Sequence, residues 1–265
     1  LRFLNNKFAA RRTARQAYKA RLSTFFSWCV LNSRLTGVKV NQCQAIRLPQ
    51  PPKRKGRMNA SVYWALHEAL PEIGRLFLGL CYASRQRPTE IRLLRESALR
   101  TDRIRFEPTK TRKSSAEYVE IVRSPWINTM LERLRELRAE RLTRRKVIAL
   151  DQQRDPFLLL SKDGTPFTTF GLNTVWRRAR ERAAKEEARR ALEAGRNDAS
   201  AALLSVTTRD IRPFSLSQME RDGYSVEAIR EAAAHTSVGM TEQYLNQHRE
   251  RFSVAVLTPP AKPGT

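Results

Sequence analysis

The residues best suited to chemistry are several cationic side chains and one phenol, and most of them lie in the last third of the chain. The stretch 208–245 opens with an Arg-x-x-Arg motif formed by Arg209 and Arg212. His235 follows in a His-Thr-Ser sequence, and Tyr244 comes just before the end of the stretch.

Two further groups lie upstream. Arg87 and Glu90 form an Arg-x-x-Glu motif, and a lysine-rich segment runs from Lys110 to Lys113. We expect the cations of all these motifs to converge on one phosphate group, beside the hydroxyl group of Tyr244.

Such a set could cleave a DNA phosphodiester without a metal ion. The planar guanidinium group of arginine meets two phosphate oxygens and keeps its charge, so Arg87 and Arg212 are the candidate clamps. The phenol of Tyr244 can form a covalent phosphoester. A lysine among other cations can protonate the departing 5′ oxygen, and Lys110 is the candidate. His235 would add a hydrogen-bond donor. Each residue alone also fits an ordinary surface or packing role, so the combination carries the prediction.

The charge balance indicates a polyanionic partner. The 265 residues include 50 Lys and Arg against 26 Asp and Glu, giving a formal net charge of +24 and a pI near 11.1. Because self-repulsion of this size destabilises a compact domain, we expect a polyanion to oppose it, and nucleic acid is the leading candidate. An anionic membrane surface is a weaker candidate. A generic RNA-binding protein lacks support because no aromatic-bearing strand motif of that type occurs.

Membrane, secretory and metal-binding roles are not favoured. The sequence has no run of about 18 apolar residues and no signal peptide. Cys29, Cys43 and Cys81 lack metal-ligand spacing and are predicted to be reduced, buried thiols of a cytoplasmic protein. With only three histidines as well, we expect no bound metal and no cofactor. The chain begins at Leu1 rather than Met, which predicts a fragment.

The first 48 residues are predicted to form a partial helical DNA-binding segment. Residues 13–35 carry apolar side chains at helical spacing, and these are Tyr18, Leu22, Phe25, Phe26 and Cys29. Arg15 and Lys19 lie elsewhere on the helix and are predicted to contact DNA, although a solvated basic face is the alternative. Residues 49–57 form a proline-rich basic linker, which adds Lys53, Arg54 and Lys55 as predicted DNA contacts.

Residues 58–265 are predicted to form the catalytic domain, ending in a loose Pro-rich tail. Helices are expected after Ser61 and from Pro71, with a short one from Pro88 and another over 125–142. Two strand-like runs, 103–106 and 118–122, predict a β-hairpin with a basic tip. Residues 171–204 are partly helical with a solvated face, and Ser225 caps the helix that leads to His235. The predicted fold is therefore mostly α with a small antiparallel β-sheet, and the hairpin tip adds Arg112 and Lys113 as DNA contacts beside Lys110.

These motifs, in this order, resemble those of the tyrosine recombinases, the phage-integrase family of site-specific DNA recombinases. The family's first box, Thr-Gly-x-Arg-x-x-Glu-Leu, is matched by residues 84–91, and its hairpin lysine by Lys110. Its second box, His-x-Leu-Arg, is matched by 209–212, and its Leu-Gly-His-Ser-Ser element by 233–237. The nucleophile follows nine residues after that histidine, at Tyr244. The resemblance covers residues 58–250, and 13–47 resemble the closing helices of the family's core-binding domain.

The resemblance implies specific roles. Arg87 and Arg212 would hold the scissile phosphate, and Glu90 would support the site around Arg87. Lys110 would protonate the leaving 5′ hydroxyl group, and Tyr244 would form a 3′-phosphotyrosine. The remaining site residues would be Arg209 and His235, with His235 hydrogen-bonded to the phosphate. Four protomers would then exchange strands through a Holliday junction, with no metal and no cofactor.

The chain departs from the family pattern in four respects. Arg209 replaces the second-box histidine, and arginine cannot act as a base near neutral pH. Arg85 replaces the first-box glycine, which predicts an altered turn before Arg87. Residues 183–205 resemble an insertion. The N-terminal segment is short and lacks an arm-type DNA-binding domain, so a fragment of this kind is expected to cleave DNA better than it recombines it.

Two rival functions are also compatible with the sequence. One is a type IB topoisomerase-like enzyme, which relaxes DNA without exchanging partners. The other is a catalytically impaired DNA-binding relative of the same fold, with Arg209 as the sign of lost activity.

Overall fold

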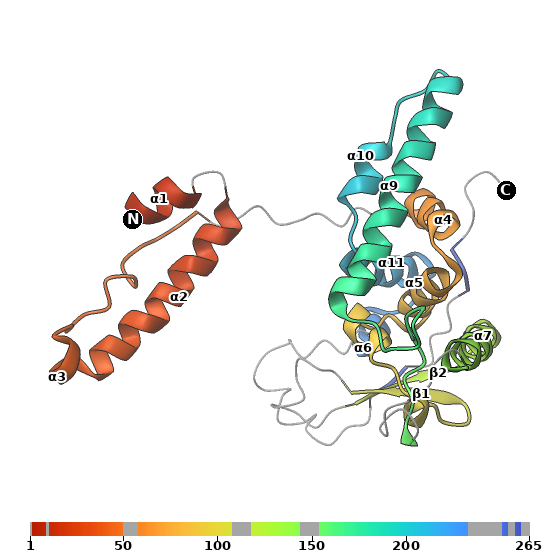
Figure 1. The fold of residues 1–265 in the computed structure, drawn as a ribbon, viewed down its shortest axis with the longest axis horizontal. Coiled ribbons are helices and arrows are strands. Elements are labelled where there is room, and N and C mark those ends of the chain that lie inside the picture. The colour runs from red at the N-terminus through yellow and green to blue at the C-terminus, as the bar shows by residue number, and fades with distance from the viewer. Residues whose placement is uncertain are drawn as a thin grey trace. The chain divides into compact units, whose positions relative to one another are not determined.

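In the computed structural model, the residues described are 2–8, 11–49, 58–107, 118–143, 154–232, 251–253 and 258–260. The chain forms two compact units, Leu1–Lys55 and Gly56–Thr265 (Figure 1). The predicted linker, 49–57, lies outside the described residues except for its first member. Of the helices described, none has the length and apolarity needed to cross a membrane.

The first unit consists of three helices. These are α1 (Arg2–Phe8), α2 (Arg12–Leu31) and α3 (Ser33–Thr36). The single helix predicted over 13–35 is thus a long helix and a short one, divided at Asn32. The buried side chain of Asn41 fastens the following segment to α2, because its amide donates to the Ser23 carbonyl and to Ser27 Oγ, both at 2.8 Å.

The predicted apolar face of α2 is only partly covered. Cys29 is buried, whereas Tyr18 and Phe25 are 40% and 56% exposed. Phe8 of α1 stacks on Tyr18 with ring centroids 4.4 Å apart, so the short first helix covers only this end of the face.

The second unit is mostly helical, as predicted, and its core is continuous. Its helices, with 3-10 turns marked η, are α4 (Ala60–Ala69), α5 (Glu72–Ser84), α6 (Pro88–Arg92), η1 (Glu96–Ala98), α7 (Pro125–Leu142), α9 (Thr169–Glu193), α10 (Ser200–Ser205), η2 (Thr208–Asp210), α11 (Ile211–Arg221) and α12 (Val226–Ala232). The predicted helix over 125–142 coincides with α7, and its buried residues recur at helical spacing: Ile127, Met130, Leu131, Leu134 and Leu137. All three cysteines of the chain are free and buried, which confirms that prediction.

The small sheet contains the predicted antiparallel pair and one strand that was not predicted. Strand β1 (Arg103–Phe106) pairs antiparallel with β2 (Val119–Val122). Strand β3 (Arg251–Ser253) then adds to the other edge of β2 in parallel orientation. The strand order β1-β2-β3 therefore brings residues shortly after Tyr244 back to the sheet.

Helices α4 and α5 supply much of the core, and their caps differ from those predicted. Asn59, not Ser61, caps α4, because its side chain accepts a hydrogen bond from the Val62 amide at 2.9 Å. Ser61 lies inside the helix. Asparagine in an extended conformation satisfies an amide that the first helical turn leaves without a partner. Pro71 is the residue before α5 rather than its first residue.

Helix α9 is the longest of the described elements, and its C-terminal part, the loop that follows and α10 together make up the predicted insertion, 183–205. Its C-terminal end and the loop that follows project from the rest of the unit, and α10 folds back beside it (Figure 1). The break in the chain comes at Ala194 and Gly195, where Gly195 has φ of 59°. The stretch 171–204 is therefore partly helical, as predicted.

The prediction of a loose C-terminal tail is wrong for Pro260, whereas Thr258 and Pro259 are exposed. The Trp64 indole N–H in α4 donates to the Pro260 carbonyl at 2.7 Å, and Pro260 is buried. A proline-rich segment lacks amide donors, but its carbonyl groups remain strong acceptors. This contact attaches the chain end to the second unit.

Candidate active site

The turn between α5 and α6 positions Arg87. Helix α5 ends at Arg85, which adopts a left-handed conformation with φ of 58° and is fully buried. Arg85 therefore adopts a backbone conformation that glycine adopts more easily. Unlike glycine, it also places a large cationic side chain in the protein interior. Gln86 follows, also buried, and Arg87 then precedes Pro88 at the start of α6.

Glu90 organises the first turn of α6. Its Oε2 accepts a hydrogen bond from the Arg87 amide at 2.7 Å, and its Oε1 lies 3.4 Å from Arg87 Nη1. The Glu90 side chain is only 2% exposed, so this charge-assisted contact is shielded from water. The carboxylate thus holds both the backbone and the guanidinium group of Arg87.

The junction between η2 and α11 positions Arg209 and Arg212. The Thr207 amide and hydroxyl group donate to Asp210 Oδ2 at 2.6 and 2.9 Å, which fixes the turn. Arg212 lies in the first turn of α11 and is only 7% exposed, whereas Arg209 is exposed.

Helix α9 holds this junction in place from behind. The Trp176 indole N–H donates to the Val206 carbonyl at 3.2 Å, and Arg180 Nη1 donates to the same carbonyl at 2.8 Å. Because Val206 comes just before η2, these bonds set where the second arginine motif begins.

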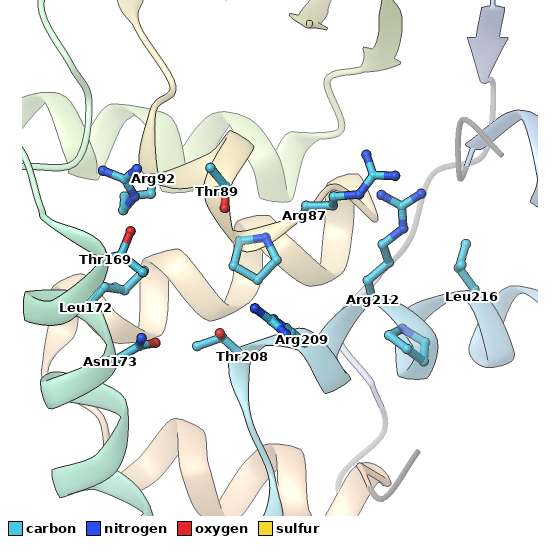
Figure 2. A pocket seen from close by; sticks show the side chains of 12 residues that line it. Arg87, Thr89, Arg92, Thr169, Leu172, Asn173, Thr208, Arg209, Arg212 and Leu216 are labelled. Atoms are coloured by element: carbon cyan, nitrogen blue, oxygen red, sulfur yellow. The ribbon is translucent and has the colours of Figure 1, made fainter. Parts of the chain in front are cut away.

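The two motifs meet in one pocket with a volume of about 820 Å³. Its lining includes four arginines and, among the described residues, no Asp or Glu: it consists of Arg87, Pro88, Thr89, Arg92, Thr169, Leu172, Asn173, Thr208, Arg209, Arg212, Pro213 and Leu216. Figure 2 shows the guanidinium groups of Arg87 and Arg212 side by side at one end, with Arg92, Thr169 and Asn173 at the other.

Two like charges are held together at the Arg87 end. Burial, and then the positive charge of Arg87, lower the pKa of Arg212 to about 10, while Glu90 opposes this shift. At neutral pH, Arg212 is still a cation. Adjacent cations repel each other unless an anion lies between them, so this end of the pocket is built to bind a negatively charged group.

The structure brings together four of the predicted site residues. Arg87, Arg209 and Arg212 line the pocket, and Glu90 contacts Arg87. The other three, Lys110, His235 and Tyr244, lie outside the described residues, as do the predicted DNA contacts Lys53, Arg54, Lys55, Arg112 and Lys113.

The two remaining predicted DNA contacts, Arg15 and Lys19, belong to α2 of the first unit. Both are half-buried, so they are not part of a fully solvated face. Their contact with DNA stays a prediction.

Sequence reasoning did not identify the far wall of the pocket. Arg92, Thr169 and Asn173 line it, and Arg92 Nη1 also donates to the Phe167 carbonyl at 2.7 Å. The capped N-terminus of α9, where Thr168 Oγ1 accepts from the Gly171 amide at 2.9 Å, provides this wall. In the sequence, the only indication of this wall is a group of polar residues near a predicted helix start.

No group of three or more His, Cys, Asp or Glu within the described part of the chain is arranged to hold a metal ion. The charged groups in the described lining of the pocket are guanidinium groups, which attract the oxygens of phosphate or carboxylate ligands.

Comparison with known proteins agrees with this geometry. The model of the phage integrase family matches residues 57–251. Among solved structures, a lambda integrase (75–356) dimer bound to a COC′ core site has a TM-score of 0.63 at 16% identity, with 93% of this chain and 78% of that chain covered. XerH site-specific recombinase bound to difH substrate has a TM-score of 0.58 at 15% identity, with 92% and 65% covered.

The similarity to longer proteins is partial. The chain spans 61% of the longer lambda integrase in another complex with a COC′ core site. At these identities the structural similarity shows a shared fold, and no curated protein matches in sequence. The family match extends over most of the chain and includes both arginine motifs of the pocket. The chain therefore belongs to the phage integrase family, the tyrosine recombinases.

Proposed function

We propose that this protein is a site-specific DNA recombinase that cleaves and rejoins double-stranded DNA through a covalent 3′-phosphotyrosine at Tyr244. The observation that carries the proposal is the pairing of Arg87 and Arg212 at one end of a pocket with no acidic lining among its described residues. These arginines come from motifs more than a hundred positions apart, so the fold has been organised to bring their charges together.

A phosphodiester is the anion that suits this pair. Its two non-bridging oxygens carry the charge that grows in the pentavalent transition state, and two fixed guanidinium groups stabilise that charge. The pocket volume of about 820 Å³ exceeds the space of a single phosphate, which leaves room for the adjoining sugars. In this assignment Glu90 keeps Arg87 oriented, and Arg209 adds a third donor.

The proposed reaction conserves bonds and needs no cofactor. Tyr244 gives its phenolic proton to solvent and its oxygen attacks phosphorus, the bond from phosphorus to the 5′ oxygen breaks, and Lys110 supplies the proton that this oxygen takes up. His235 hydrogen-bonds the phosphate. The 5′ hydroxyl group of another strand then attacks the phosphotyrosine and releases Tyr244, so the energy of the original bond is kept for rejoining.

Strand exchange in this proposal involves four protomers and two duplexes. A lambda integrase tetramer bound to a Holliday junction shares the fold, with a TM-score of 0.62, which supports the same intermediate for this chain. Residues 1–48 and the linker 49–57 would bind DNA around the site through Arg15, Lys19 and the linker cations, and 58–265 would carry the chemistry.

The decisive experiment detects the covalent intermediate. The protein is incubated with a randomised pool of nicked DNA duplexes. After cleavage near the nick the short fragment diffuses away, so rejoining is prevented and the covalent adduct accumulates. Captured DNA is sequenced, and the attached peptide is mapped by mass spectrometry. We expect the adduct on Tyr244, unchanged by a metal chelator.

Tyr244→Phe should abolish this adduct and leave DNA affinity nearly intact, since only the nucleophilic oxygen is removed. Adduct that persists in this variant would assign the nucleophile to another residue. Paired copies of the captured site then separate recombination from simple relaxation, because only a recombinase yields exchanged products.

The exposed position of Arg209 favours one second candidate, a DNA-binding relative with impaired catalysis. Arginine is a donor but not a base near neutral pH, so it cannot replace a histidine in proton transfer. If Arg209 is the cause of lost activity, Arg209→His should raise the rate of adduct formation. If Arg209 serves the proposed enzyme as a phosphate donor, the same change should leave the rate equal or lower.

A further inference from the structure

Arg85 combines two features that proteins ordinarily avoid. Its backbone has φ of 58°, a conformation that costs a non-glycine residue energy, and its side chain has 0% of its surface exposed. A buried cation also loses its hydration. A structure retains such a residue only where its surroundings stabilise it, so Arg85 is expected to have a role of its own.

The guanidinium group of Arg85 lies near the turn that leads into α12. Tyr224, in this turn, and Tyr82, on α5, lie near enough to act electrostatically on its guanidinium group. Burial lowers the pKa of Arg85 to about 10, and these two tyrosines oppose the shift, so it is a cation at neutral pH. The negative charge of Asp222 acts electrostatically on Tyr82. The Tyr82 ring also packs against Phe214 of α11, with ring centroids 5.5 Å apart. The buried cation at the end of α5 therefore lies near the turn that precedes α12.

Gln86 makes the corresponding contact with the other end of α12. Its side-chain amide donates to the Ala232 carbonyl at 3.4 Å and to the Ser84 carbonyl at 3.3 Å. The backbone amide of Gln86 donates to Ser84 Oγ at 3.4 Å. Gln86 is 1% exposed and Ala232 is fully buried, so the contact is shielded from water. Ala232 is the last residue of α12, three positions before His235.

We propose that Arg85 and Gln86 are positioning residues that hold the two ends of α12 against the turn bearing Arg87. Through α12 they fix the point from which the chain continues to His235 and Tyr244. Neither residue takes part in holding the phosphate, which is assigned to their neighbour Arg87. The catalytic consequence rests on the function proposed above, whereas the hold on α12 does not.

The Arg85→Gly variant distinguishes an arginine that holds α12 from one that the turn only tolerates. Glycine adopts positive φ without strain, so Arg85→Gly should be neutral or stabilising if the arginine is only tolerated in the turn. If the arginine holds α12, the same variant should loosen that helix even though the turn itself is relaxed. Gln86→Met, which keeps the length of the side chain but removes its amide, tests the second contact independently.

The experiment uses the full chain in two measurements. In the first, hydrogen–deuterium exchange without DNA, peptides covering 226–232 should exchange about tenfold faster in both variants, with peptides of α7 unchanged. In the second, single-turnover adduct formation at saturating nicked DNA should slow by about tenfold or more, with Kd within about twofold, because a misplaced reactive group slows chemistry more than binding. Arg75→Ala, on the exposed side of α5, is the matched control and should change neither measurement.

Arg85→Lys should restore part of the lost rate, since it keeps the buried charge but not the planar fork. Exchange over 226–232 equal to that of the parent would overturn the proposal, and so would faster exchange by one common factor in every helix, which would indicate general destabilisation. Faster exchange confined to α12 with an unchanged adduct rate would overturn the positioning role. A parent protein that forms no adduct would refute the proposed function, while the exchange measurement would still decide whether the two residues hold α12.

Discussion

Arginine is abundant in two parts of the second unit, and the two parts use it in opposite ways. In the C-terminal half of α9 the arginines are exposed and lie beside glutamates, as Arg189 does with Glu186 at 2.6 Å and Glu193 at 2.5 Å. In the pocket, Arg87 and Arg212 lie beside each other, and the only carboxylate assigned to them among the described residues, Glu90, is held by the Arg87 backbone.

This difference separates a solvated helix from a site. Exposed pairs on α9 are screened by water, and each contributes little to stability. The pocket instead keeps positive charge without matching carboxylates in its described lining, partly out of water, where an anion gains far more from it. Both regions are rich in arginine, so burial and pairing, rather than residue type, identify the functional one.

The largest expected effect is the loss of a pocket arginine. Arg212→Ala should slow adduct formation by a factor of about 100 or more, equivalent to about 3 kcal/mol, because it removes a donor to the transition-state charge. The measurement is single-turnover adduct formation with saturating DNA. Arg189→Ala, the matched change on α9, should leave the rate unchanged. If the two variants have the same rate, the contrast between the regions has no catalytic meaning.

An intermediate effect is expected from the carboxylates. Glu90→Ala should lower the free energy of unfolding by about 1–3 kcal/mol, because it leaves the Arg87 amide without its shielded acceptor. Urea titration measures this change. Glu193→Ala on α9 should change the same quantity by about 0.5 kcal/mol or less, as for other exposed ion pairs. Equal losses in both variants would contradict the distinction between buried and exposed pairing.

The smallest effect concerns acid. Hydrogen bonds from Arg189 and Arg190 lower the pKa of Glu186 to about 2. A carboxylate with a lowered pKa in the folded state stabilises the fold above its unfolded pKa of about 4.3 and loses this effect as the pH falls towards 2. Comparing the Tm of Glu186→Gln with that of the parent should therefore give a difference of about 2 °C or less at pH 6, and none near pH 2. A difference that grows in acid would reverse the assigned sign.

Sequence reasoning succeeds where periodicity or motif order determines the answer. The apolar spacing over 125–142 predicts α7 correctly, because a helix in contact with the core must bury one side. The alternating run at 103–106 predicts β1, whose burial alternates strictly. The order of the motifs predicts that Arg87 and Arg212 share a site, and both line the pocket.

It fails where packing between distant segments decides. A buried arginine such as Arg85 cannot be distinguished in the sequence from the many exposed ones, because burial depends on what the fold places around it. In the sequence, Thr169 and Asn173 look like ordinary residues of a helix start. In the folded protein they line the same pocket as residues of α6. Strand β3 has only three residues, and its pairing with β2 is set by contacts rather than by local preference.

Beyond Ala232, the pairing of β3 with β2 and the Trp64–Pro260 hydrogen bond attach the chain to the second unit again, so both flanks of the segment between Ala232 and Arg251 are held. The entropy of closing a loop rises slowly with its length, by about 0.6 kcal/mol for each doubling. If Tyr244 is the nucleophile, as proposed, a few residues inserted after it should hardly change its effective concentration at the pocket, whereas removing the chain from β3 onward would release one end and lower that concentration. In the proposed function, strand β3 and the Pro260 contact would therefore anchor the chain that follows Tyr244.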